Sequence, residues 1–384
     1  MPDLVALALP GGPGFVEALT RAWEAGDAVA PLDPRLPPAA TAAVLDALAP
    51  TVVVDGDGER HRRPGGRPVE EGDALVVATS GTTGRPKGVV LTHQAVLASA
   101  RATSARLGVD PGSDRWLACL PLAHVGGLSV VTRALLTGTP VVVHPGFDAE
   151  AVSEAAGGGG PVTLVSLVAT TMARIDPGRF RIVVLGGSAP LGVLPANAVT
   201  TYGLTETGSG VVYDGVPLQG VEVSFGAREE ILLRGPMLAR GYRDGSDPRT
   251  AGGWLPTGDA GGWDADGRLA VWGRLDDMVV TGGENVWPVA VEAVLRGHPG
   301  VAEVAVAGRP DPEWGQRVVA FVVPAGGHRD PPSLDGLRGL VKERLGPWAA
   351  PRELVLVDSL PRTSIGKVRR ARLERAAVAG PAGA

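Results

Sequence analysis

Residues 74–89 read Ala74-Leu-Val-Val-Ala-Thr-Ser-Gly-Thr-Thr-Gly-Arg-Pro-Lys-Gly-Val89, and this stretch carries the strongest single signal in the sequence. The apolar run 74–78 is typical of a strand that is buried on both faces. The glycines that follow let backbone N–H groups approach phosphate oxygens without a clash at Cβ, and the Ser and Thr hydroxyls add hydrogen-bond donors. Lys87 can supply a positive charge to a polyphosphate. We therefore expect a phosphate-binding loop between a buried strand and a helix; the alternative is a flexible surface hairpin.

Outward from this loop, apolar and β-branched runs bounded by Gly, Pro and Asp recur through the first two-thirds of the chain. Besides residues 74–78 they cover 51–55, 140–144, 162–166 and 181–185. Helical patterns lie between them: one candidate is 148–156, and another has an apolar face formed by Val96, Leu97, Ala100, Ser104 and Leu107. Strands that alternate with helices predict a wound α/β sheet.

The pattern changes after about residue 220 to short strands and Gly-rich turns, as at 230–234 and 269–273. This change predicts a small β subdomain. From residue 277 onward we expect a compact α+β set, with strands at 278–281, 301–307, 317–323 and 354–357 and helices at 288–296 and 333–345. A domain boundary is expected near residues 274–277, because polar residues lie there between two predicted strands.

Composition limits the class of protein. The 384 residues include 44% hydrophobic and 20% charged side chains, which is the balance of a soluble globular protein. The net charge of −5 argues against nucleic acid or an anionic membrane as a partner. Cys119 is the single cysteine, so an intrachain disulfide is excluded. No signal peptide is expected at the start, and no run approaches the length of a membrane span. The cytoplasm is the expected location.

Further motifs follow the loop in the sequence. Residues 185–190 read Leu-Gly-Gly-Ser-Ala-Pro, 201–208 Thr-Tyr-Gly-Leu-Thr-Glu-Thr-Gly, 254–259 Trp-Leu-Pro-Thr-Gly-Asp, 273–288 Gly-Arg-Leu-Asp-Asp-Met-Val-Val-Thr-Gly-Gly-Glu-Asn-Val-Trp-Pro, and 361–367 Pro-Arg-Thr-Ser-Ile-Gly-Lys. With the phosphate loop, and in this order, they resemble the motifs of the acyl-adenylate-forming superfamily of acyl-CoA synthetases, luciferases and adenylation domains. The resemblance covers residues 74–372.

The resemblance implies an ATP site. Its residues would be Thr79, Ser80, Gly81, Thr82, Thr83, Lys87, Gly187, Ser188, Ala189, Thr201, Tyr202, Gly203, Asp259 and Arg274. Tyr202 would pack on adenine, Thr205 would contact the α-phosphate, and Glu206 would bind the metal. A carboxylate beside triphosphate oxygens suits Mg²⁺, although a solvated loop acid is the alternative for Glu206. Asp259 would accept hydrogen bonds from the ribose hydroxyls, although an aspartate in a Gly-rich turn also has a structural explanation.

The resemblance also implies a mobile lid. Lys367 would neutralise the charge that develops between the substrate carboxylate and the α-phosphate, although a lysine in such a loop is commonly surface. Asp276 would be the pivot, and Gly282 and Gly283 would line a CoA tunnel. We thus expect an ATP- and acyl-binding N-terminal domain at 1–273, abbreviated at its start, a hinge at 274–276 and a C-terminal lid domain at 277–384.

The acid is suggested by two features. The run Gly282-Gly-Glu-Asn-Val-Trp-Pro288 is close to the form in o-succinylbenzoate–CoA ligases of menaquinone synthesis, and the short N-terminus resembles the short members of that group. The acyl site would include His124, Arg133, Gly186 and Ser209. Arg133 can offer a fork of donors to the ring carboxylate, which is left unreacted and needs a partner when buried. The alternatives are a capping or core role for His124 and an arginine that extends from an apolar helix to solvent.

The predicted function is therefore an ATP-dependent carboxylic acid–CoA ligase that works through an acyl-AMP intermediate, with o-succinylbenzoate as the acid. ATP, Mg²⁺ and CoA are the expected substrates and cofactor, and a homodimer is an expected assembly. Another acyl- or aryl-CoA ligase, a nucleotide-binding homologue without catalysis, and a domain that charges a carrier protein are the alternatives. Retention of Lys367, Glu206 and Asp259 together argues against loss of catalysis.

Overall fold

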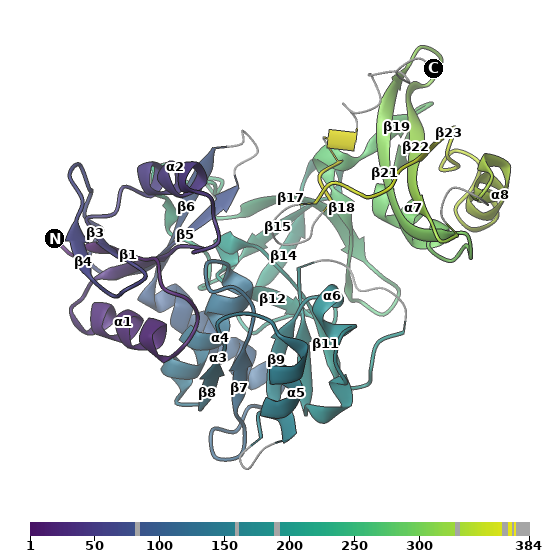
Figure 1. The fold of residues 1–384 in the computed structure, drawn as a ribbon. Coiled ribbons are helices and arrows are strands. Elements are labelled where there is room, and N and C mark those ends of the chain that lie inside the picture. The colour runs from purple at the N-terminus through teal and green to yellow at the C-terminus, as the bar shows by residue number, and fades with distance from the viewer. Residues whose placement is uncertain are drawn as a thin grey trace. The chain divides into compact units, whose positions relative to one another are not determined.

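The computed structural model describes residues 1–80, 85–157, 161–187, 193–326, 331–362, 368–370 and 372–373. The chain divides into two compact units. The first comprises residues 1–224, 232–257 and 265–269, and the second comprises residues 225–231, 258–264 and 270–384. Figure 1 gives the order of the elements along the chain. The expected α/β class, with a large N-terminal part and a smaller C-terminal part, is confirmed.

Two seven-stranded sheets build most of the first unit, where the sequence predicted one wound sheet. The first has the order β16-β6-β5-β2-β1-β3-β4. Its strands are β1 (Leu4–Leu7), β2 (Ala28–Pro31), β3 (Val52–Val54), β4 (Arg60–Arg62), β5 (Asp73–Ser80), β6 (Pro86–Thr92) and β16 (Gly241–Tyr242). Strands β3, β1, β2 and β5 run parallel, whereas β4, β6 and β16 pair antiparallel with their neighbours.

The second sheet has the order β13-β12-β11-β10-β9-β7-β8. Its strands are β7 (Trp116–Ala118), β8 (Val141–Val143), β9 (Leu164–Leu167), β10 (Ile182–Leu185), β11 (Ala198–Gly203), β12 (Gly210–Tyr213) and β13 (Val216–Pro217). The five strands from β8 to β11 are parallel, and β8, β9 and β10 correspond to near-continuous apolar runs in the sequence. Buried Leu, Val and Phe side chains of this sheet form one core cluster together with Cys119, whose thiol pKa burial raises to about 12.

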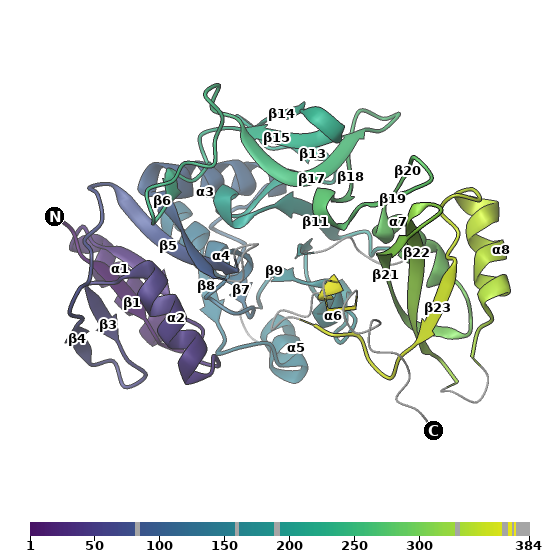
Figure 2. The ribbon, with the colours of Figure 1, turned by 90° about the horizontal axis from the view of Figure 1, so that it is seen from above.

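The helices of the first unit cover these sheets. They are α1 (Pro13–Glu24), α2 (Pro38–Leu48), α3 (His93–Leu107), α4 (Val125–Thr137), α5 (Ala149–Gly157) and α6 (Ala169–Met172). Helix α1 packs on β1 and β2, and α2 packs on β5 and β6; α1 and α2 are labelled beside this sheet in Figure 2. Helices α3 and α4 pack against each other. None of the helices among the described residues is long and apolar enough to cross a membrane.

The prediction of a helix directly after the phosphate loop is wrong. Strand β6 follows the loop and pairs with β5, and α3 begins only at His93. The physical reason is that Val89, Val90 and Leu91 are β-branched or apolar residues that complete the buried sheet. The Thr92 side chain then accepts a hydrogen bond from the Ala95 N–H at 3.1 Å and so caps the helix.

A four-stranded sheet, β14-β15-β17-β18, corresponds to the predicted β subdomain. Its strands are β14 (Glu222–Phe225), β15 (Glu230–Arg234), β17 (Leu255–Trp263) and β18 (Leu269–Arg274). A further sheet lies in the second unit and has β19 (Val279–Thr281), β20 (Glu284–Val286), β21 (Val301–Asp311), β22 (Gly315–Pro324) and β23 (Glu353–Leu356). Helices α7 (Pro288–Leu295) and α8 (Leu334–Arg344) share a buried core cluster with this sheet. All six elements predicted from 278 to 357 are present.

Candidate active site

Strands β5 and β6 lie on either side of the predicted phosphate-binding residues and pair with each other. Thr79 pairs with Lys87, and Ser80 pairs with Pro86. The hairpin reading and the phosphate-loop reading are therefore compatible, because the Gly- and Thr-rich residues connect two paired strands. Lys87 is half-buried, and its Nζ lies 5.0 Å from the centroid of the Tyr242 ring. An ammonium over an aromatic face is held in place by the ring rather than by an anionic side chain, which suits a residue that is to bind a phosphate.

Glu206 lies in the short 3₁₀ turn η2 (Thr205–Thr207) after β11. Its Oε1 accepts a hydrogen bond from the Tyr242 hydroxyl at 2.9 Å. No lysine or arginine pairs with its half-buried carboxylate among the residues that the structure describes. A carboxylate without a basic partner has the chemistry of a magnesium ligand that is shared with phosphate oxygens. The residues present therefore fit the expected metal.

The carboxyl ends of β10 and β11 come together beside this turn. The Thr201 hydroxyl donates to the Leu185 carbonyl at 3.2 Å, and a Cβ on Gly186 would lie 3.0 Å from that hydroxyl oxygen. A Cβ on Gly203 would lie 2.3 Å from the Ser209 carbonyl oxygen, so only glycine fits there. The predicted residues Gly186, Thr201 and Gly203 thus lie together near the carboxyl ends of the adjacent strands β10 and β11. Ligands of open parallel α/β sheets bind at these ends of the strands.

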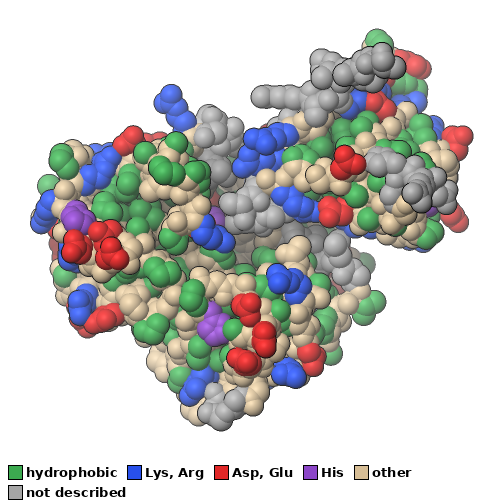
Figure 3. Space-filling view, viewed as in Figure 1, with side chains coloured by type: hydrophobic (Ala, Val, Ile, Leu, Met, Phe, Trp, Pro, Cys, Tyr) green, Lys and Arg blue, Asp and Glu red, His purple; other side chains and the backbone are tan. Residues whose placement is uncertain are grey.

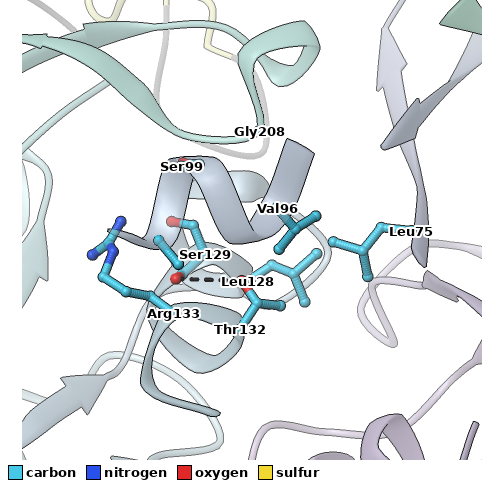
Figure 4. A pocket seen from close by; sticks show the side chains of 9 residues that line it. Leu75, Val96, Ser99, Leu128, Ser129, Thr132, Arg133 and Gly208 are labelled. Carbon is cyan, nitrogen blue, oxygen red and sulfur yellow. Dashed lines mark hydrogen bonds between the residues drawn. The ribbon is translucent and has the colours of Figure 1, made fainter. Parts of the chain in front are cut away.

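A pocket lies between β5, α3 and α4 and reaches Gly208 (Figure 4). Its lining combines apolar side chains with three hydroxyls and one cation: Leu75, Val96, Ser99, Ala100, Leu128, Ser129, Thr132 and Arg133. Leu75, Val96 and Leu128 lie toward one end of the pocket, and the Arg133 guanidinium points toward the other. The free space between these side chains is only about 10 Å³, which is enough for one water molecule, so a larger ligand requires the side chains to move.

Arg133 is only 2% exposed, so the alternative of an arginine that extends to solvent is excluded. Its Nη2 donates to Ser209 Oγ at 3.2 Å, its Cζ lies 5.0 Å from the Trp116 ring centroid, and its Nε has no hydrogen-bond partner. Burial lowers the pKa of Arg133, and no carboxylate among the described residues offsets this effect. A buried cation without an anion is costly unless a ligand supplies the anion.

Ser209 and His124 occupy different surroundings. Ser209 is buried, accepts the hydrogen bond from Arg133 and donates to Ser129 Oγ at 3.2 Å. The structure therefore brings two of the predicted acyl-site residues into direct contact. His124 is the N-cap residue of α4, and its carbonyl accepts from the Gly127 and Leu128 N–H groups. Its side chain makes no capping hydrogen bond, so its role at the acyl site stays a prediction.

In the second unit, Asp259 and Arg274 form a pair, with Arg274 Nη1 at 3.1 Å from Asp259 Oδ1. The two side chains belong to the adjacent strands β17 and β18. Asp276 is exposed in the 3₁₀ turn η4 (Leu275–Asp277), directly after β18. Gly282 and Gly283 form the β19–β20 turn with φ of 60° and 85°, and a Cβ on Gly282 would lie 2.7 Å from the Trp314 ring. The positive φ angles and the close Trp314 ring therefore favour glycine at these positions, whether or not the two residues line a CoA tunnel.

Several predicted site residues lie outside the described residues: Gly81, Thr82, Thr83, Ser188, Ala189 and Lys367. Two residues near the site were missed by sequence reasoning. Tyr242 is on a two-residue strand that carries no periodic signal. Ser129 precedes Arg133 by one helical repeat on α4, and that spacing would have placed both on one face.

Figure 3 shows acidic and basic side chains interspersed over the face that it presents. Among the described residues of this face, basic side chains do not form a continuous surface. This distribution agrees with a small-molecule site and with the net charge of −5.

Comparisons with known proteins identify relatives. Residues 58–243 match the family described as "AMP-binding enzyme", and residues 290–367 match "AMP-binding enzyme C-terminal domain". A "Probable 2-succinylbenzoate–CoA ligase" from Mycobacterium tuberculosis is 43% identical over 335 residues, which is 81% of this chain and 86% of the relative.

Solved structures with the same fold include o-succinylbenzoate CoA synthetase (MenE) from Bacillus subtilis in complex with the acyl-adenylate intermediate OSB-AMP. It is 28% identical with a TM-score of 0.84, and the match covers 97% of this chain and 88% of that chain. The same enzyme in complex with ATP and magnesium ion is 28% identical with a TM-score of 0.82, covering 97% and 89%.

Proposed function

The chain belongs to the AMP-binding enzyme family as an AMP-forming acid–CoA ligase, and we propose that the acid it activates is 2-succinylbenzoate, in menaquinone biosynthesis. The observation that carries the proposal is Arg133, a fully buried cation at one end of a pocket whose other end is apolar. 2-Succinylbenzoate offers an aromatic ring to apolar side chains and, in the carboxylate that does not react, an anion to the buried Arg133 guanidinium. The relatives named above support the same acid.

The reaction has two steps. The succinyl carboxylate of the acid attacks the α-phosphorus of ATP, forming the acyl–phosphate bond of acyl-AMP as the bond to pyrophosphate breaks. The CoA thiolate then attacks the acyl carbon, and AMP leaves with the electron pair of the broken carbon–oxygen bond. In our proposal Lys87 and the hydroxyls of the β5–β6 hairpin bind the phosphates, and Thr205 contacts the α-phosphate. Asp259 and Arg274 hold the ribose, and Arg133 with Ser209 orients the acid by its ring carboxylate.

We propose Glu206 as the residue that holds Mg²⁺. When bound, the metal neutralises phosphate charge. Glu206→Gln keeps the shape of the side chain but removes its charge. We expect the Mg²⁺ concentration for half-maximal adenylation to rise at least about tenfold, because hydrogen bonding by the amide cannot replace a charged ligand. A Mg²⁺ titration of pyrophosphate release measures this. An unchanged titration would mean that Glu206 is not the ligand.

We also propose that residues 274–276 form the hinge between the two half-reactions, with Asp276 as the pivot and 277–384 as the lid. Asp276→Pro fixes φ near −65°. This φ suits the first turn of a 3₁₀ helix, so each unit should keep its fold while rotation at this residue is blocked. We expect the variant to lose one half-reaction by roughly two orders of magnitude and retain the other, as with other gating defects. A proline variant with normal overall turnover places the hinge elsewhere.

A homodimer in the cytoplasm remains part of the proposal. The chain has a mass of 39.1 kDa, so light scattering after size exclusion distinguishes one copy from two directly. The acyl pocket is lined by one chain alone, and the proposed chemistry does not depend on the outcome.

The function is tested by pyrophosphate release across a panel of acids, with and without CoA. The panel contains 2-succinylbenzoate, benzoate, 4-phenylbutyrate and medium-chain fatty acids. The proposal predicts that 2-succinylbenzoate releases pyrophosphate far faster than the monoacids and that CoA converts the adenylate to a thioester. Fast pyrophosphate release with a monoacid would show that the substrate is not 2-succinylbenzoate, and the assignment as an acid–CoA ligase would stand. If pyrophosphate is released but the addition of CoA gives no thioester, the acyl acceptor is another molecule, such as a carrier protein.

A further inference from the structure

One tyrosine that belongs to none of the predicted nucleotide motifs connects two segments of the candidate ATP site. The Tyr242 hydroxyl donates to Glu206 Oε1 at 2.9 Å, and the Tyr242 ring lies 5.0 Å from Lys87 Nζ. The same side chain therefore contacts the expected metal ligand through its polar end and the expected phosphate-binding cation through its face.

The backbone holds this tyrosine in place on both sides. Strand β16 pairs antiparallel with β6, with Tyr242 opposite Val89, two residues after Lys87. Three residues before Tyr242, the Ala239 N–H donates to the Glu206 carbonyl at 2.7 Å. Both the β6 strand and the η2 turn are thus fixed to the segment 239–242. The distance between Tyr242 and its two partners is consequently set by main-chain hydrogen bonds rather than by a flexible loop.

The hydroxyl is the donor in the bond to Glu206. The phenol carries one O–H donor, whereas a carboxylate oxygen only accepts, so the Tyr242 hydroxyl donates to Glu206. A carboxylate has two oxygens, and a hydrogen bond to one of them fixes the orientation of the other. The Glu206 carboxylate is therefore oriented before any ligand binds, which reduces the cost of ordering it around a metal.

We propose that Tyr242 is a positioning residue of the metal–phosphate site. It orients the Glu206 carboxylate toward the metal through its hydroxyl, and its ring supports the Lys87 ammonium beside the phosphates. This inference rests on the proposed function, in which Glu206 holds magnesium and Lys87 binds phosphate.

Tyr242→Phe separates the two contacts, because it removes the hydroxyl and keeps the ring. ATP binding to the purified chain is measured by calorimetry across a range of MgCl₂ concentrations and, separately, in EDTA. We expect the Mg²⁺ concentration for half-maximal tightening of ATP binding to rise about tenfold, the usual consequence of losing a hydrogen bond to a charged group. ATP affinity in EDTA should stay within about twofold, because Lys87 keeps its aromatic neighbour.

Tyr213→Phe is the matched control. It also removes one tyrosine hydroxyl from this unit, one that lies 3.2 Å from the Thr103 hydroxyl, and it should leave the Mg²⁺ dependence unchanged. A merely structural role for Tyr242 predicts a lower melting temperature and equal loss of ATP affinity with and without metal. That result, or an unchanged Mg²⁺ dependence, would overturn the inference.

A double-mutant cycle with Glu206→Gln distinguishes failure of this inference from failure of the proposed function. If Tyr242 acts through Glu206, then Tyr242→Phe adds little further change in the Mg²⁺ dependence when Glu206 is already glutamine. Independent, fully additive effects would reject the coupling and leave Glu206 as the ligand. No effect of Glu206→Gln alone would instead reject the metal site of the proposed function.

Discussion

Lys367→Ala is expected to lower the rate of adenylation by about a thousandfold, while CoA captures supplied acyl-AMP at close to the wild-type rate. Removing one group that stabilises transition-state charge typically costs two to three orders of magnitude. The expectation rests on the match of residues 361–367 to the terminal motif of the superfamily, in which the lysine serves only the first step. Burst measurement of pyrophosphate and a separate thioester assay with synthetic acyl-AMP resolve the two half-reactions.

Lys342→Ala is the matched control for this experiment. Lys342 is an exposed lysine in the last turn of α8, within the same domain. Its loss should leave both half-reactions unchanged. If Lys367→Ala slowed both half-reactions equally, the lysine would have a structural role and the two-step lid mechanism would lose its main support.

Arg133→Ala is expected to lower kcat/KM for 2-succinylbenzoate by about a hundredfold, because truncating one partner of a buried charge pair commonly costs 2–5 kcal/mol. The same variant should change kcat/KM much less for 4-oxo-4-phenylbutanoate, which lacks the ring carboxylate. In the wild type this analogue leaves the buried guanidinium without an anion, which costs binding free energy. The variant has no guanidinium, so it does not pay this cost.

Arg133 also packs near the Trp116 ring, so loss of packing must be separated from loss of charge. Arg133→Met keeps a long side chain in that space and removes the charge. Both variants should lose discrimination between the two acids to the same extent if the charge is responsible. Discrimination retained in both variants would remove Arg133 from the acyl site but would not by itself change the substrate.

The sequence predicted the elements that carry local signals. Buried parallel strands such as β9 and β10 are near-continuous apolar runs, and the Glu206 and Lys87 motifs are contiguous. In the C-terminal part, α8 begins where Ser333 accepts a hydrogen bond from the Gly336 N–H, which is a capping pattern that sequence alone reveals. These features depend on neighbouring residues, so they can be recognised without a structure.

Features that depend on distant pairing could not be predicted in this way. The strand β6 looked like the start of a helix because residues 89–91 are apolar and a helical pattern follows at once. The division of the strands into two sheets depends on pairings such as β6 with β16, which are about 150 residues apart. Tyr242 lies on that distant strand, so its contact with Glu206 was not visible in any local pattern.

The central claim is that this chain activates a dicarboxylic aromatic acid that it holds by the carboxylate left unreacted. The most direct measurement is the ratio of kcat/KM for 2-succinylbenzoate to kcat/KM for 4-oxo-4-phenylbutanoate with the wild-type chain, both followed by thioester formation with CoA. A site built around a buried charge predicts a ratio of at least about a hundred, because the analogue leaves the Arg133 guanidinium unpaired. A ratio near one, or faster use of the monoacid, would contradict the claim and leave only the ligase class.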